Sequence, residues 1–181
     1  VRAAAFFAFC PATLMTADRF FKGLIATVAI GMSLYHLTIA FIGAPQQLFF
    51  RSTHLLFALA LVFLAFPLSS GRASAGPFDL VLLASSAAVV LYLFVNYTYL
   101  VNRIPYIDDP TNLDMAMAAL AIVLVLEGTR RVIGLALPIT ALIFVAYALL
   151  FTDVGLARFF DQIYLTTEGI FGSTLGVSAG Y

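Results

Sequence analysis

Long uncharged stretches are the feature that most limits how this chain can fold. Charged residues interrupt the sequence at intervals, and the apolar cores between them cover about residues 23–42, 54–66, 80–99 and 132–151. The uncharged intervals are close to the roughly 20 residues that a helix needs to cross a hydrocarbon core of about 30 Å. Lipid offers no partner to exposed backbone groups, so helices are required there. Four membrane-spanning helices are predicted on this basis.

The composition agrees with a membrane protein and excludes several other classes. Hydrophobic residues make up 63% of the 181 residues and charged residues 10%, whereas a soluble domain carries about 25% charged residues. A soluble fold of this size could not bury so much apolar surface. The net charge of zero gives a nucleic-acid partner no electrostatic support. Cys10 is the only cysteine, which excludes disulfide frameworks and cysteine-based metal sites.

Residues 115–126 form an apolar stretch too short to be assigned from its length alone. It could cross the membrane as a short span, form a re-entrant helix, lie at the interface, or join the following span in one long bent helix. Five spans with a cytoplasmic N-terminus place six Lys and Arg residues inside and three outside, whereas four spans place five and four. Positive charge gathers on the cytoplasmic side. We therefore predict an all-α integral membrane protein with about five transmembrane helices.

The remaining segments are predicted to be connections. Residues 1–17 would be a cytoplasmic N-terminal segment, and residues 69–77 a loop of small residues in which Pro77, with Asp79, suits the first turn of a helix. Residues 102–114 would lie outside, and an ordinary solvated turn is favoured there over an ion funnel or a docking surface. Residues 152–165 alternate apolar and charged side chains, which predicts a short amphipathic helix at the interface.

Polar residues inside the predicted spans are few, and such residues persist in membranes mainly for function. For His36, a helix-packing hydrogen bond is favoured over a proton relay or ligand role, and His54 is predicted at the headgroup level. The two histidines are too far apart in sequence to suggest a metal pair on one helix. Glu127 is spaced to pair locally with Arg130 and Arg131, a reading favoured over coupling to an ion gradient.

Small residues and helix breakers predict how the spans pack. Residues 84–88 are all Ala or Ser, which predicts that the third span is buried among other helices. Gly134 and Pro138 predict a kink in the last span. No nucleotide-binding, metalloprotease or nucleophile motif is present in the sequence, so an enzyme is not expected and no cofactor is predicted.

Four stretches resemble fused tripartite ATP-independent periplasmic (TRAP) transporter permeases. The runs 126–134 (LEGTRRVIG) and 136–140 (ALPIT) resemble a motif of this family, residues 164–179 resemble the beginning of its large membrane domain, and residues 51–56 resemble its second span. The similarity covers about residues 18–181. Ser173, Thr174 and Gly180 depart from the family pattern. The positions that carry the resemblance are Leu126, Glu127, Arg130, Arg131, Pro138, Thr166, Thr167, Glu168, Gly169, Phe171 and Gly172.

The resemblance implies a secondary transporter in a bacterial or archaeal inner membrane. Such permeases are usually sodium-coupled and import organic acids delivered by a periplasmic binding protein, here of the TAXI class. Residues 18–151 would then be the small scaffold domain plus a linking span, and residues 152–165 a connector. Residues 166–181 would open the large transport domain, with the substrate and sodium sites beyond Tyr181, so we expect a fragment of a longer polypeptide. The alternative is a multi-span anchoring or assembly protein that transports nothing.

Overall fold

The computed structural model describes residues 19–43, 45–68, 76–104, 107–151, 155–166, 169–172 and 175, and every element in them is a helix. The predicted segment 1–17, together with Cys10, Thr167, Glu168, Ser173, Thr174 and Gly180, lies outside these residues. The helices are α3 (Arg19–Ile42), α4 (Gln47–Ala65), α5 (Pro77–Val95), α6 (Tyr97–Asn102), α7 (Asn112–Val132), α8 (Ala136–Phe151), α9 (Leu156–Phe160) and the π-helix η1 (Asp161–Leu165).

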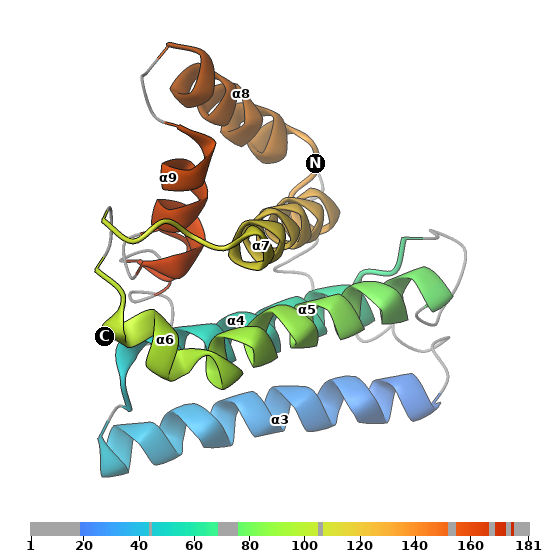
Figure 1. Cartoon of the computed structure of the whole chain (residues 1–181). Coiled ribbons are helices and arrows are strands. Elements are labelled where there is room, and N and C mark those ends of the chain that lie inside the picture. The colour runs from blue at the N-terminus through green and yellow to red at the C-terminus, as the bar shows by residue number, and fades with distance from the viewer. Residues whose placement is uncertain are drawn as a thin grey trace.

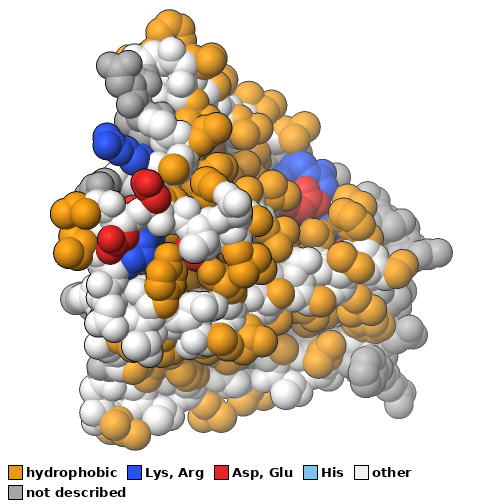
Figure 2. Space-filling view, viewed as in Figure 1, with side chains coloured by type: hydrophobic (Ala, Val, Ile, Leu, Met, Phe, Trp, Pro, Cys, Tyr) orange, Lys and Arg blue, Asp and Glu red, His pale blue; other side chains and the backbone are white. Residues whose placement is uncertain are grey.

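The lengths and composition of these helices confirm the predicted fold class. Four of them (α3, α4, α5 and α7) are long and apolar enough to cross a membrane, and α8 is a shorter apolar helix. Apolar side chains cover much of the visible surface, while charged side chains gather in two places, one over α6 and α9 and one beside α7 (Figure 2). The chain is an all-α, multi-pass membrane protein.

The helix α4 is the centre of the bundle. It packs against α3, α5 and α7, and α8 and α9 lie on the far side of α7 from α3 (Figure 1). In the most apolar window of each helix, 56% of α4 is buried, but only 28% of α5 and none of α3. The prediction that the third span is buried among other helices therefore holds for one face only. Ser86 is buried with Val89, Val90 and Leu93, whereas Ala84, Ala87 and Ala88 are exposed.

The short stretch 115–126 belongs to α7, a helix of 21 residues. The helix begins early because Thr111 caps it: the Asp114 amide donates to the Thr111 hydroxyl at 3.2 Å. It continues through Glu127, Arg130 and Arg131, so its span is longer than the uncharged stretch. Residues 115–126 are therefore part of a helix that is long and apolar enough to cross a membrane.

A break, not a kink, separates α7 from α8. Gly134 has φ +100, a left-handed conformation that L side chains avoid, and the helix ends there. One long bent helix through Glu127–Arg131 is therefore excluded, and the last span begins at Ala136 instead of at residue 132. Pro138 is the third residue of α8, where its missing N–H breaks no helical hydrogen bond.

The segments that connect the long helices largely agree with the predictions from the sequence. Pro77 is the first residue of α5, and the Asp79 carboxylate accepts a hydrogen bond from the Gly76 amide at 2.8 Å, as predicted for a helix first turn. The third span ends at Val95, four residues earlier than predicted, and α6 follows as a separate short helix. The predicted helix in residues 152–165 is present as α9 and η1, packed against α7. Its position at a lipid surface stays a prediction.

Candidate functional site: polar clusters at the two ends of the bundle

A buried ion pair joins α6 to the π-helix at one end of the bundle. The guanidinium of Arg103, the residue after α6, lies 2.7 Å from the Asp161 carboxylate, and both side chains are at most 5% exposed. The same guanidinium donates to the backbone carbonyl of Asp108, and the Asp108 carboxylate accepts from the Ile104 amide at 2.9 Å. Arg103 thus fixes the 102–114 loop to a helix 58 residues away in sequence.

Asp114 is the centre of a second network at this end. It is fully buried, and its carboxylate accepts hydrogen bonds from the Tyr92 hydroxyl (2.5 Å), the Tyr99 hydroxyl (3.2 Å) and the Thr111 amide (2.8 Å). Burial and the neighbouring Asp114 carboxylate raise the pKa of Tyr99, so this phenol keeps its proton and remains a donor. The network stabilises a buried carboxylate with hydrogen-bond donors and ties α5 and α6 to the start of α7.

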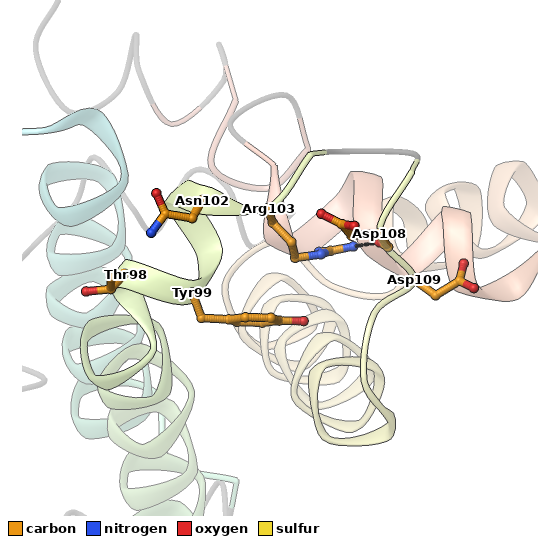
Figure 3. A pocket seen from close by; sticks show the side chains of 6 residues that line it. All are labelled: Thr98, Tyr99, Asn102, Arg103, Asp108 and Asp109. Carbon is orange, nitrogen blue, oxygen red and sulfur yellow. Dashed lines mark hydrogen bonds between the residues drawn. The ribbon is translucent and has the colours of Figure 1, made fainter.

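An open polar hollow of about 470 Å³ lies beside these two networks. In Figure 3, the side chains of Tyr99, Arg103 and Asp108 extend toward one another, while Asp109 lies at the edge. The hollow is lined by Thr98, Tyr99, Asn102, Arg103, Asp108 and Asp109. Its one cation is already paired with Asp161, so the hollow has no uncommitted charge for an anionic ligand. The prediction of a solvated turn holds for Asp108 and Asp109, which are exposed, and is wrong for Arg103 and Asp114.

The residues after the π-helix also attach at this end. The Arg51 guanidinium, at the start of α4, donates to the Phe171 carbonyl at 2.7 Å, and Phe171 itself is fully buried. The Tyr164 hydroxyl donates to the Val89 carbonyl at 2.9 Å, and burial raises the pKa of Tyr164, so it too stays protonated. These contacts span up to 120 residues of sequence, and no sequence pattern indicated them.

The opposite end of the bundle holds a second ionic cluster, centred on Arg131. The predicted local pairing is present: Glu127 accepts from Arg130 at 2.7 Å and from Arg131 at 2.8 Å. Arg131 also pairs with Asp79 at 2.6 Å, donates to the Phe66 carbonyl at 3.1 Å, and lies 5.0 Å from the centre of the Phe63 ring. It therefore joins the end of α7 to α5 and to the end of α4, which the sequence did not indicate.

We expect Arg131→Gln to destabilise the protein more than Arg130→Gln. The Arg131 side chain is 3% exposed and contacts α4 and α5. Its loss should cost about 1–3 kcal/mol, since Asp79 keeps the Gly76 amide as a donor. Arg130 is 36% exposed and pairs only locally in the described contacts, which predicts a loss of about 0.5 kcal/mol or less. Denaturation of the two variants in detergent micelles would measure this difference, and equal losses would contradict the assignment of Arg131 as the joining residue.

The two histidines, which the sequence gave no reason to combine, lie together between α3 and α4. Nδ1 of His54 is 2.9 Å from Nε2 of His36, so the predicted helix-packing hydrogen bond of His36 is present. His54 is 8% exposed and lies seven residues into α4, about 10 Å along the helix. It is thus a helix-contact residue.

The positions that resemble the TRAP family fall into two separate groups. Leu126, Glu127, Arg130 and Arg131 lie on the last turns of α7, and Pro138 lies in the first turn of α8. Thr166, Gly169, Phe171 and Gly172 follow the π-helix, where the Phe171 carbonyl accepts from Arg51. Because Arg51 is near the start of α4 and Phe66 follows its end, the two groups sit at opposite ends of this helix and do not form one site.

The described residues hold no group of three or more His, Cys, Asp or Glu side chains that could bind a metal ion. The ion pairs Arg103–Asp161 and Arg131–Asp79 join different parts of the bundle, whereas Glu127 pairs with Arg130 and Arg131 within α7. Comparisons with protein-family models, curated proteins and solved structures found no match to this chain.

Proposed function

We propose that this chain is the scaffold part of a TRAP-type permease, a sodium-coupled secondary importer of organic acids delivered by a periplasmic TAXI-type binding protein. One observation carries the proposal. The resembling residues Glu127, Arg130 and Arg131 form a cluster that fixes α7 to α5 through Asp79. Motif residues of a scaffold domain are expected to hold its helices together in this way.

The remaining polar contacts support a scaffold in the same way. The ion pair Arg103–Asp161 and the hydrogen bond from Arg51 to Phe171 attach the residues after α8 to the bundle. A chain that positions a following domain needs such a rigid attachment at the point where that domain begins. In this proposal the substrate and sodium sites belong to the large transport domain beyond Tyr181.

The proposed site of action is a bacterial or archaeal inner membrane, with the N-terminus in the cytoplasm. The 102–114 loop would then face outward and the Arg131 cluster inward. In a Cys10→Ser background, we expect Asp109→Cys to react with an impermeant maleimide on intact cells, and Thr129→Cys to react only after permeabilisation. Labelling of Thr129→Cys on intact cells would contradict this orientation of the chain in the membrane.

Transport by the gene product tests the function itself. We expect vesicles that contain the complete gene product to take up an organic acid only when a periplasmic binding protein is present and sodium is higher outside. Equal uptake without the binding protein or without the sodium gradient would contradict the proposal. A gene product that ends at Tyr181, inserts stably and transports none of a panel of organic acids would favour the anchoring or assembly protein instead.

A further inference from the structure

The helix α3 packs against the bundle along α4. At this contact, two histidine side chains lie among aromatic rings. The Tyr35 ring lies 6.2 Å from the Phe50 ring and 5.9 Å from the Phe57 ring, and the His36 ring lies 5.5 Å from Phe50. Among these rings, the His36 and His54 rings meet edge to face with their centres 5.0 Å apart. Two titratable side chains thus share a contact between two apolar helices.

The hydrogen bonds fix which nitrogen of each neutral ring carries the hydrogen. Nδ1 of His36 is 2.7 Å from the Met32 carbonyl, which can only accept, so this nitrogen carries the hydrogen. Nε2 of a neutral His36 then has a free lone pair and accepts from Nδ1–H of His54 at 2.9 Å. In a neutral His54, Nε2 is left with a lone pair, and no hydrogen bond to it is present among the described residues.

We propose that the His36–His54 pair is a binding site for one proton, taken up at Nε2 of His54, and that this proton strengthens the attachment of α3 to α4. A hydronium ion gives a proton to the Nε2 lone pair: one of its O–H bonds breaks, a water molecule leaves, and His54 becomes an imidazolium. The Nδ1–H of His54 still points at Nε2 of His36. That hydrogen bond becomes charge-assisted, which makes it roughly twice as strong as a neutral one.

The same geometry limits the pair to one proton. A second proton would have to bond to Nε2 of His36, so that two N–H groups faced each other and the hydrogen bond was lost. The pair is also not a proton relay. The Nδ1–H of His36 donates to the Met32 carbonyl, and a carbonyl has no hydrogen that it could pass on. The site therefore binds a proton and does not conduct it.

The groups around the pair are few. On α3, Tyr35 touches His36, and Lys22 lies fourteen residues earlier, about 21 Å along the helix. The rings of Tyr35 and Phe50 both contact the His36 ring. On α4, Arg51 lies one helical turn before His54, and its charge, which the neutral Phe171 carbonyl does not cancel, opposes that of an imidazolium. The groups on α5 and α7 pair with one another: Asp79 with Arg131, Tyr92 with Asp114, and Glu127 with Arg130 and Arg131.

Nitrogen NMR of the histidine rings tests this proposal, which does not depend on the transport function. The chain has only two histidines, so ring-¹⁵N-labelled chain in lipid bilayers gives two sets of signals, assigned with His36→Gln and His54→Gln. We expect both rings to carry their hydrogen on Nδ1 at alkaline pH, and acidification to add one proton, to Nε2 of His54. A ring with its hydrogen on Nε2, uptake of two protons by the intact pair, uptake of none, or protonation of His36 first would each overturn the proposal.

A matched pair of variants tests the effect on helix attachment. Cross-linking between cysteines placed on α3 and α4 should increase on acidification in the wild-type background. His36→Gln keeps an acceptor for Nδ1–H of His54 and should retain the increase, whereas His36→Leu removes the acceptor and should abolish it. An increase of the same size in His36→Leu would show that the proton does not act through this hydrogen bond.

Discussion

Replacing Arg103 by alanine is expected to lower the free energy of unfolding by about 3–5 kcal/mol, because the buried Asp161 carboxylate loses the guanidinium that compensates its charge. Arg103 and Asp161 are 5% and 3% exposed, and their charged atoms lie 2.7 Å apart. The variant also loses the hydrogen bond to the Asp108 carbonyl. Both losses fall where the 102–114 loop meets the π-helix, so this end of the bundle should open first.

Arg158→Ala is the matched control for this variant. Arg158 is an exposed arginine on α9, three residues from Asp161, and its loss should change the free energy of unfolding by at most about 0.5 kcal/mol. Denaturation of both variants in detergent micelles, followed by circular dichroism, would measure the difference. If Arg103→Ala were no less stable than Arg158→Ala, the buried pair would have no structural role.

The double variant Arg103→Met, Asp161→Leu shows whether the loss in Arg103→Ala comes from the buried Asp161 carboxylate that remains or from the absence of the ion pair itself. Buried ion pairs are often replaced by apolar residues at little cost, since both charges then avoid desolvation. We expect the double variant to be more stable than Arg103→Ala, although Asp108 still loses its donor. A double variant that is less stable than Arg103→Ala would show that the pair itself stabilises the fold.

The sequence predicted which residues are helical far better than it predicted where the helices meet. Charge spacing located the spans because lipid excludes charged side chains and unpaired backbone groups. The same rule misjudged α7, since the carboxylates of Glu127 and Asp79 pair with Arg130 and Arg131 and the helix continues through these charges. It also overestimated the last span, because the left-handed backbone at Gly134 separates α7 from α8.

The candidate sites were predicted only where their residues are close in sequence. The pairing of Glu127 with Arg130 and Arg131 follows from helical spacing. The partners of Arg103, Arg51 and Arg131 lie 58, 120 and 52 residues away, and a single sequence contains no signal that relates them. His36 and His54 were set aside as a pair for the same reason, since a spacing of eighteen residues says nothing about two different helices.

Replacing Gly169 by alanine is expected to destabilise the residues after the π-helix by about 3–5 kcal/mol. A Cβ atom at this position would lie 2.2 Å from the Ile163 carbonyl oxygen and 2.4 Å from the Gln162 carbonyl oxygen. Both are backbone atoms, so no side-chain rotation relieves the contact. The turn must move, and the fully buried Phe171 ring would then lose its packing, a loss comparable to that of Phe→Ala in a core.

Two comparisons make the Gly169 result specific. Gly23→Ala is the control, because a Cβ there meets nothing within 4 Å, and alanine in a helix should be neutral or up to about 1 kcal/mol stabilising. If Gly169→Ala acts by displacing Phe171, then adding Phe171→Ala should cost little more, since the two changes remove the same packing. Additive losses would place the effect in the turn alone, and a stable Gly169→Ala variant would contradict the close approach of this turn to Ile163.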